Sequence, residues 1–238
     1  MQTILVLNSK GGCGKSTIAT NLASYYAADG VRCMLMDYDP QGSSLQWLKL
    51  RPHRQAPIHG VNASKTRVGL TRTWQMAVPA GTGRVVIDAP AGVAGLTLQE
   101  MLRRSNIVLV PVTPSPIDIH ATLRFVRDLL AGGTTVKYGV HIGVVANRVR
   151  RSTSQFEPLK QYLAAAGVPF VTTLSDSENY IHAAEMGIGL HEMDERETGA
   201  EREQWKPLIR WLSDPTQEIM SPEIRPRLNV IAGQAAKG

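Results

Sequence analysis

A short glycine-rich loop near the N-terminus constrains the fold of this chain more than any other feature. The loop spans Lys10–Thr17, reads KGGCGKST, and follows the apolar run Thr3–Leu7. After it, Ile18 and Leu22 recur with the spacing of one helix face. Glycines allow backbone N–H groups to turn inward around phosphate oxygens, and the start of a helix adds partial positive charge there. The sequence therefore predicts a strand, a phosphate-binding loop and a helix in succession.

The loop matches the general pattern G-x-x-x-x-G-K-[ST] except at its first glycine, where Ser9 stands. Lys15 would supply a full positive charge to the β- and γ-phosphates, and the Ser16 hydroxyl would ligate Mg²⁺. The loop residues expected to bind the nucleotide are Gly11, Gly12, Cys13, Gly14, Lys15, Ser16 and Thr17. The loop thus predicts ATP and Mg²⁺ as cofactors.

Apolar runs alternate with amphipathic segments along most of the chain. Strands are expected at Thr3–Leu7, Val31–Met36, Arg84–Ile87, Asn106–Val112, Val140–Ala146 and Val168–Thr172, and helices at Lys15–Ala28, Ser44–Leu50, Ile117–Leu130, Phe156–Ala166 and Trp205–Leu212. Such alternation indicates a sheet covered on both faces. We therefore predict an α/β three-layer sandwich with a mostly parallel central sheet flanked by helices, the P-loop NTPase fold. Residues 1–213 should form one domain, and the tail at 214–238 should be loosely ordered.

Chemically useful residues stand where the expected strands end. They are Asn8, Asp37, Asp88, Pro111 and Asn147, each at the carboxyl end of a different strand. Ligand sites in open parallel sheets lie at the carboxyl ends of the strands. We therefore expect these five residues to gather along one edge of the sheet, beside the phosphate-binding loop.

The loop resembles the signature K-G-G-x-G-K-[ST] of the ParA/MinD family of deviant Walker A ATPases, and is closest to the small ParA-type partition ATPases. Lys10–Ser16 matches that signature throughout. The resemblance implies a homodimer with ATP sandwiched at its interface, in which Lys10 reaches the partner's nucleotide. A cation delivered in this way offsets charge that develops on the transferred phosphoryl group, so Lys10 and Lys15 are both expected to be catalytic.

Two acidic segments resemble further motifs of that family. Asp37–Gly42 is similar to its D-x-D-P-Q switch I segment, which implies that Asp39 positions the attacking water and that Asp37 belongs to the Mg²⁺ shell through water. Val85–Gly92 resembles a Walker B strand that runs into switch II, which implies that Asp88 holds Mg²⁺ or its water.

Later segments resemble the base-binding parts of the family. Asn147 closes a strand where the family places an asparagine that hydrogen-bonds adenine. Ser175 and Asp176 align loosely with its second base-contacting loop. The resemblance therefore assigns all three residues to nucleotide binding.

The charge pattern bears on the partner. The chain has a formal net charge of +6 and a pI of about 9.5. Between Lys49 and Arg84 it carries seven Lys or Arg residues and no Asp or Glu, and Arg148, Arg150 and Arg151 form a second basic cluster. A solvent-exposed surface with an uneven distribution of charge would account for the first segment equally well. We expect the arginine cluster to bind DNA without sequence preference.

Three functional classes fit the resemblance. A ParA-like ATPase would dimerise with ATP, bind the nucleoid, and be released when a cargo-bound partner stimulates slow hydrolysis. Its cargo could be a plasmid, a chromosome region or a protein organelle such as a carboxysome. A MinD-like ATPase would need an amphipathic C-terminal helix for the membrane, which Pro222 and Pro226 disfavour. A redox relative would need an iron–sulfur ligand set, which Cys13 and Cys33 do not form.

The first class is the favoured prediction. No apolar run is long enough to cross a bilayer, and two cysteines are too few for a disulfide framework, so a reducing cytoplasm is the simpler location. We expect a cytoplasmic, nucleoid-associated protein that has no membrane partner.

Overall fold

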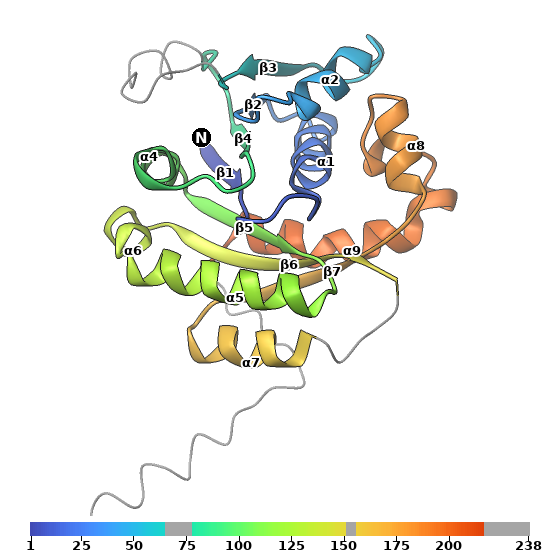
Figure 1. Cartoon of the computed structure of the whole chain (residues 1–238). Coiled ribbons are helices and arrows are strands. Elements are labelled where there is room, and N and C mark those ends of the chain that lie inside the picture. The colour runs from blue at the N-terminus through green and yellow to red at the C-terminus, as the bar shows by residue number, and fades with distance from the viewer. Residues whose placement is uncertain (65–77, 151–155, 217–238) are drawn as a thin grey trace, which may run out of the picture.

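One parallel sheet forms the centre of the molecule. The computed structural model describes residues 1–64, 78–150 and 156–216. Within them seven strands lie in the order β3-β2-β4-β1-β5-β6-β7, and all neighbouring pairs are parallel (Figure 1). The strands are β1 (Gln2–Val6), β2 (Cys33–Asp37), β3 (Ile58–Asn62), β4 (Arg84–Asp88), β5 (Ile107–Val112), β6 (His141–Val149) and β7 (Phe170–Ser175).

Helices cover both faces of this sheet, which makes three layers and confirms the predicted fold class (Figure 1). On one face lie α1 (Lys15–Ala28) and α9 (Glu195–Ser213), with α2 (Ser43–Leu50) beside them. On the other face lie α4 (Gly95–Arg104), α5 (Pro116–Ala131) and α7 (Glu157–Ala165). The short helices are α6 (Thr134–Tyr138), α8 (Asn179–Glu185) and the 3₁₀ helix η2 (Leu190–Glu192).

The two apolar layers share the central strand. In β1, Ile4 packs with Ile18 and Trp205 on one side of the sheet, whereas Leu5 faces the opposite layer with Leu159. All five side chains are almost completely buried. Successive strand residues point to opposite faces, so a strand covered on both faces must be apolar at every position. This requirement explains the uninterrupted apolar runs in the sequence.

The register of the sheet brings two acidic residues together. Asp88 lies opposite Val6 of β1 and opposite Asp37 of β2. Both acidic residues are therefore at the carboxyl edge, where β1 leads into the glycine-rich loop. The predicted gathering of strand-end residues is confirmed for this pair.

Several elements differ from the sequence prediction. Strand β3 and helices α4, α6 and α8 were not expected. β3, α6 and α8 are short and expose much of their length, whereas α4 does carry an apolar face, with Met101 and Leu102 buried, that the sequence prediction missed. Strand β6 continues past Ala146 to Val149. Helix α9 begins at Glu195 rather than near Trp205, since the Asp194 side chain caps its first turn.

The C-terminal part of the chain is described only a few residues past its last helix. The last helix ends at Ser213, the predicted domain limit, but residues 217–238 of the expected tail lie outside the described residues. In the described parts of the chain, no helix has the length and apolar character needed to cross a membrane.

Candidate nucleotide-binding site

The glycine-rich loop adopts a backbone that only glycine accepts easily. Gly12 and Gly14 have φ angles of 75° and 91°, and Gly14 is the residue that precedes α1. A Cβ atom at Gly14 would lie 2.1 Å from Nδ2 of Asn147, so a side chain has no space there. The start of α1 has no side-chain cap. Its first N–H groups are therefore available to an anion held by the loop.

The side chain of Lys15 lies within this loop and is almost buried, at 7% exposure. Its Nζ donates a hydrogen bond to the carbonyl oxygen of Lys10 at 2.9 Å. Cys13 directs its thiol to the same carbonyl oxygen at 3.4 Å, and burial raises the pKa of that thiol. Lys15 thus places a cation at the centre of the loop, whereas Cys13 packs there as a neutral group.

Asp88 is a buried carboxyl group that the protein leaves unpaired. Within the described ranges, neither of its oxygens has a hydrogen-bond partner of ordinary geometry. Burial raises its pKa to about 6, and the nearby Asp37 charge adds to this effect, while the hydroxyls of Ser16 and Ser44 act in the opposite direction. An unpaired buried carboxylate is costly unless an external cation or donor meets it. Asp88 and Ser16 offer the hard oxygen atoms that Mg²⁺ prefers.

The described residues form no ready-made cage for a metal ion. In the described residues, no group of three or more His, Cys, Asp or Glu side chains is arranged to hold a metal ion. Mg²⁺ commonly keeps water and binds through one or two protein oxygens together with substrate phosphates. The donor set at Asp88 and Ser16 fits this mode.

Asp37 has a different environment from Asp88, although their strands are neighbours. Its Oδ1 accepts a hydrogen bond from the backbone N–H of Asp39 at 2.9 Å. Its Oδ2 accepts from the N–H and hydroxyl of Ser44, at 3.1 and 2.8 Å, and from the N–H of Leu45 at 3.2 Å. Asp37 therefore fixes the start of α2 and the turn before it.

The turn after β2 holds Asp39 at the same edge. Oδ1 of Asp39 accepts from the N–H of Gln41 at 2.9 Å, and its carbonyl accepts from Gly42 at 2.9 Å. Gly42 has a φ angle of 66° and precedes α2. Asp39 itself is half-buried and therefore in partial contact with solvent.

The loop after β4 lies against the glycine-rich loop. A Cβ atom at Gly11 would be 3.9 Å from Cβ of Ala91, and Gly92 has a φ angle of 67°. The segment predicted as switch II therefore lies beside the glycine-rich loop.

The end of β6 forms another wall of the site. The Asn147 side chain is buried, and its Nδ2 donates to the carbonyl oxygen of Cys13 at 2.9 Å. The next residue, Arg148, has a φ angle of 57°, which is uncommon outside glycine. Asp176 pairs with Arg148 at 3.5 Å and with Arg150 at 2.9 Å, and the Arg150 hydrogen bond is the main cause of its lowered pKa. Ser175 donates its backbone N–H to Oε1 of Gln204.

A comparison with known proteins decides the family. A family model described as the CobQ/CobB/MinD/ParA nucleotide binding domain matches residues 4–190. This chain belongs to that family. The match covers the loop, both acidic segments and Asn147.

Curated relatives of the MinD/ParA type carry names that refer to positioning. Maintenance of carboxysome distribution protein A from Halothiobacillus neapolitanus is 26% identical over 174 residues, which are 72% of this chain and 77% of the relative. The protein of the same name from Gloeobacter kilaueensis is 30% identical over 171 residues, 71% of this chain and 73% of the relative. The chain is similar to both over most of their length.

Solved structures of the same family share the fold. The ATP complex of a variant McdA from Cyanothece has a TM-score of 0.64 and 16% identity, covering 88% of this chain and 94% of that one. The cell division ATPase MinD from Pyrococcus furiosus has a TM-score of 0.67 and 18% identity, covering 89% and 98%. At these identities the likeness establishes the architecture alone.

Lys10 is the loop residue that sets the ParA/MinD signature apart, and it is the more exposed of the two lysines. Its side chain is 41% exposed, and its Nζ lies 3.9 Å from Oδ1 of Asp118 on α5. Asp118 also accepts a hydrogen bond from the hydroxyl of Thr113 at 2.6 Å. Lys10 therefore lies at the outside of the loop and does not point into it with Lys15.

The structure brings together most residues that the sequence singled out, but their roles stay predictions. Ser44 and Asp118 were missed. Asp118 follows the helix-starting pair Ser115-Pro116, a signal that marks a first-turn carboxylate but not its contact with Lys10. Arg151 of the expected DNA-binding cluster lies outside the described residues.

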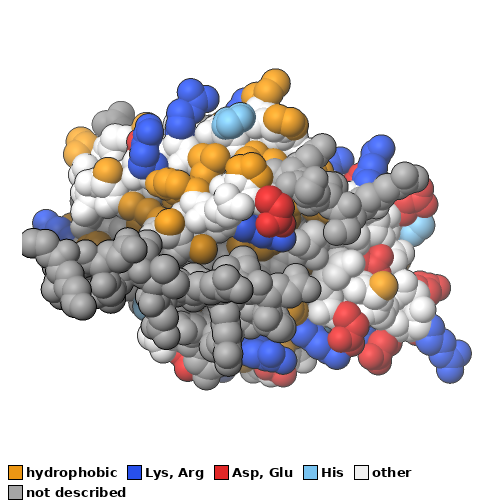
Figure 2. Space-filling view, turned by 90° about the horizontal axis from the view of Figure 1, so that it is seen from below, with side chains coloured by type: hydrophobic (Ala, Val, Ile, Leu, Met, Phe, Trp, Pro, Cys, Tyr) orange, Lys and Arg blue, Asp and Glu red, His pale blue; other side chains and the backbone are white. Residues whose placement is uncertain are grey.

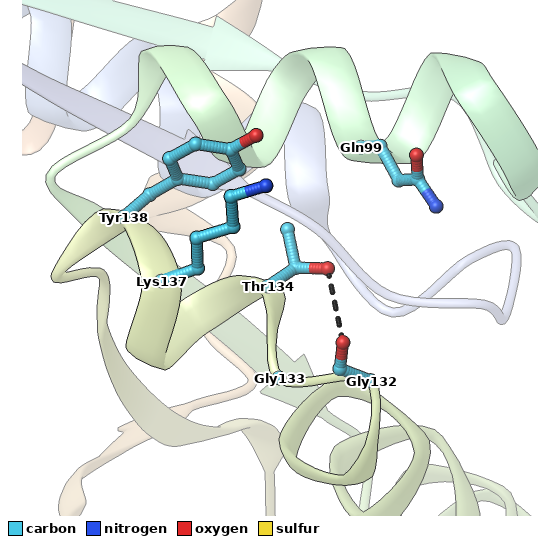
Figure 3. Close-up of a pocket in the computed structure, with 6 residues that line it drawn as sticks. All are labelled: Gln99, Gly132, Gly133, Thr134, Lys137 and Tyr138. Atoms are coloured by element: carbon cyan, nitrogen blue, oxygen red, sulfur yellow. Dashed lines mark hydrogen bonds between the residues drawn. The ribbon is translucent and has the colours of Figure 1, made fainter.

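A hollow elsewhere on the surface contains none of the predicted nucleotide-binding residues. Its volume is about 290 Å³, and it lies between α4 and α6 (Figure 3). The lining residues are Gln99, Gly132, Gly133, Thr134, Lys137 and Tyr138. The Thr134 hydroxyl donates to the carbonyl oxygen of Gly132, and the Lys137 ammonium lies 5.5 Å from the Tyr138 ring centroid. These polar side chains are engaged with neighbouring residues of the same hollow. We therefore assign the hollow no ligand.

Proposed function

We propose that this protein is a ParA-like ATPase that forms an ATP-dependent homodimer, binds DNA without sequence preference and hydrolyses ATP to position a cargo. The observation that carries the proposal is the arrangement of its charges. Lys15 is buried inside the phosphate-binding loop, Asp88 is unpaired beside it, and Lys10 is exposed at its outer side. One cation then serves the nucleotide of its own subunit, and the other is available to a partner.

Each of the predicted site residues would have a separate role in hydrolysis. Lys15 and the loop N–H groups would hold the β- and γ-phosphates, and Asp88 with Ser16 would hold Mg²⁺, which neutralises phosphate charge when bound. Asp39 would orient the water that attacks the terminal phosphorus. Asp37 has both oxygens engaged and would act on Mg²⁺ only through water, while it fixes the turn that carries Asp39.

Base binding would occur at the carboxyl ends of β6 and β7. Asn147 lies against the loop and keeps its amide oxygen for an adenine amino group. Ser175 and Asp176 follow on the neighbouring strand. Asp176 already pairs with two arginines, so its contribution would be to hold that wall in place.

The DNA-binding part of the proposal rests on charge. The chain has a net charge of +6, and Arg148, Arg150 and Arg151 would contact phosphates. Asp176 pairs with Arg148 and Arg150 and neutralises part of this cluster. On the face seen in Figure 2, the described basic side chains are scattered and mixed with acidic ones.

The names of the relatives support the proposal about the cargo. Two relatives named for carboxysome distribution favour a protein organelle, although relatives named Soj and ParA keep a chromosome or plasmid open. A cargo-bound protein would stimulate the slow hydrolysis. A MinD-like membrane role is the second candidate, because MinD structures share the fold. The C-terminal segment that would decide it lies outside the described residues.

The first test is binding to a random-sequence DNA duplex with Mg²⁺ plus ATP, ADP or no nucleotide, at two salt concentrations. Binding that requires ATP and weakens with salt supports the nucleoid-bound dimer. Equal binding in all nucleotide states would refute control of DNA binding by ATP, and no binding in any state would refute DNA as the track. Vesicles of anionic lipid in the same assay test the membrane alternative.

A further inference from the structure

Asp118 is an acceptor whose position is fixed by the elements around it. It lies in the first turn of α5, where the helix start stabilises a carboxylate. Its Oδ2 accepts the Thr113 hydroxyl at 2.6 Å, and the N–H of Ile119 donates to the carbonyl of Ser115 at 2.9 Å to close the turn. The carboxylate therefore has little freedom to move.

Lys10 combines a fixed backbone with a weakly held cation. Its N–H donates to Oδ1 of Asn8 at 3.3 Å, and its carbonyl accepts from Lys15 at 2.9 Å. Its Nζ, in contrast, lies 3.9 Å from Oδ1 of Asp118, beyond hydrogen-bond distance. Among the residues that the structure describes, only this charge contact holds the ammonium, so it can leave without disturbing the loop.

We infer that Asp118 holds Lys10 in a resting position within its own subunit, and that dimerisation with ATP requires Lys10 to leave Asp118 for the partner's nucleotide. The inference rests on the proposed role of Lys10 between subunits. Asp118 is a positioning residue, because it acts through Lys10. The Asp118 carboxylate opposes dimerisation, and this effect disappears when the carboxylate is replaced by a neutral group.

The size of this effect follows from the exposure of the pair. The Lys10 and Asp118 side chains are 41% and 31% exposed. Pairs of this kind contribute weakly, so Asp118→Asn should lower the protein concentration at half-dimerisation about two- to fivefold. Salt at about 1 M should remove most of the difference, because it screens exposed charges.

The experiment measures the monomer–dimer equilibrium of the full chain by sedimentation, with Mg²⁺ and a non-hydrolysable ATP analogue at low and high salt. Asp128→Asn is the matched control, since Asp128 lies on the same helix, pairs with Arg127 at 3.5 Å and is 72% exposed. The inference predicts tighter dimerisation for Asp118→Asn, at low salt only, and no change for the control. Unchanged or weaker dimerisation of Asp118→Asn would overturn it.

A double-mutant cycle shows whether Asp118 acts through Lys10. In the Lys10→Ala background, Asp118→Asn should have no effect on dimerisation, and an equal gain in both backgrounds contradicts the inference. Normal dimerisation of Lys10→Ala alone would refute the role of Lys10 between subunits, and with it the inference. Failure of the proposed role of Lys10 can be distinguished from failure of the inference about Asp118, because it is seen in the Lys10→Ala variant before Asp118 is changed.

Thr113→Val provides a second variant if Asp118→Asn folds poorly. It removes the hydroxyl that orients Asp118 but keeps the carboxylate charge. It should tighten dimerisation in the same direction by a smaller factor, with the same dependence on Lys10. Weaker dimerisation of this variant would contradict the inference.

Discussion

Two sets of buried charges in this molecule differ in what surrounds them. Arg51 and Glu192 form a closed pair, with side chains 5% and 2% exposed and contacts of 2.5 and 2.9 Å. The Arg51 Nε also donates to the carbonyl of Ala56, and Glu192 accepts the N–H of Gly189. Asp88, as deeply buried, has no such partner among the described residues.

The difference indicates which cluster serves structure and which awaits a ligand. The Arg51–Glu192 pair joins the end of α2 to η2, and both charges are satisfied by the protein itself. The set formed by Lys15 and Asp88 is left open, and it lies at the carboxyl edge of the sheet where parallel-sheet proteins bind ligands. Variants in the two clusters should therefore separate stability from nucleotide binding.

The largest expected effect is on stability at the closed pair. Arg51→Ala leaves Glu192 buried and unpaired, so the free energy of unfolding should fall by about 3–5 kcal/mol. Urea unfolding measures this loss. Replacing both residues, as in Arg51→Met with Glu192→Leu, should restore most of it, and a double variant as unstable as Arg51→Ala would contradict a purely structural role.

Lys15→Ala should show the reverse pattern. Loss of the charged donor should weaken ATP binding about ten- to a hundredfold, by calorimetric titration. Its urea unfolding should stay near that of the wild type in the absence of nucleotide, because Lys15 donates there only to the Lys10 carbonyl. Wild-type ATP affinity in this variant would remove the loop as the binding site.

Asp88→Asn should raise stability and abolish function together. Removing the unpaired buried charge should increase the free energy of unfolding at pH 7.5 by about 1–3 kcal/mol without nucleotide. Mg²⁺-dependent hydrolysis should be lost. A variant that is less stable than the wild type would mean that Asp88 has a structural partner, as Glu192 does.

The smallest expected effect concerns acid stability. Burial lowers the pKa of His191 to about 4, and its ring packs against Tyr25 and Trp205. Its folded-state pKa is below the unfolded value, so the unfolded chain binds the proton first as pH falls from about 6.5. The free energy of unfolding should therefore decline from pH 6.5 towards pH 4.

His191→Phe isolates this contribution from that of Asp88, whose raised pKa acts in the opposite direction. The variant should lose less stability than the wild type between pH 7 and pH 5 in urea unfolding. An equal loss in both proteins would show that His191 takes up no proton on unfolding.

The sequence allowed those parts of the molecule to be predicted that local signals define. Helix α1 begins and ends at the expected residues, because the loop fixes its start and Gly30, with a φ angle of 76°, follows its end. The gathering of Asp37 and Asp88 followed from the parallel topology alone.

Contacts between distant segments could not be predicted in this way. Arg51 and Glu192 are 141 residues apart, and nothing near either residue marks the pair. The hydrogen bond between Ser44 and Asp37, and the ion pair between Lys10 and Asp118, depend on the conformations of the loops at the carboxyl edge of the sheet. The motif resemblance indicated which residues matter, and the packing shows which of them are already satisfied.

The most direct test of the account is a mixing experiment between Lys10→Ala and Asp39→Ala subunits. Each variant alone should hydrolyse ATP poorly, because each of its sites lacks one catalytic group. In a mixed dimer, one site combines Asp39 of one subunit with Lys10 of the other, so the mixture should regain up to about a quarter of wild-type turnover. A mixture no more active than the separate variants would contradict catalysis shared between subunits.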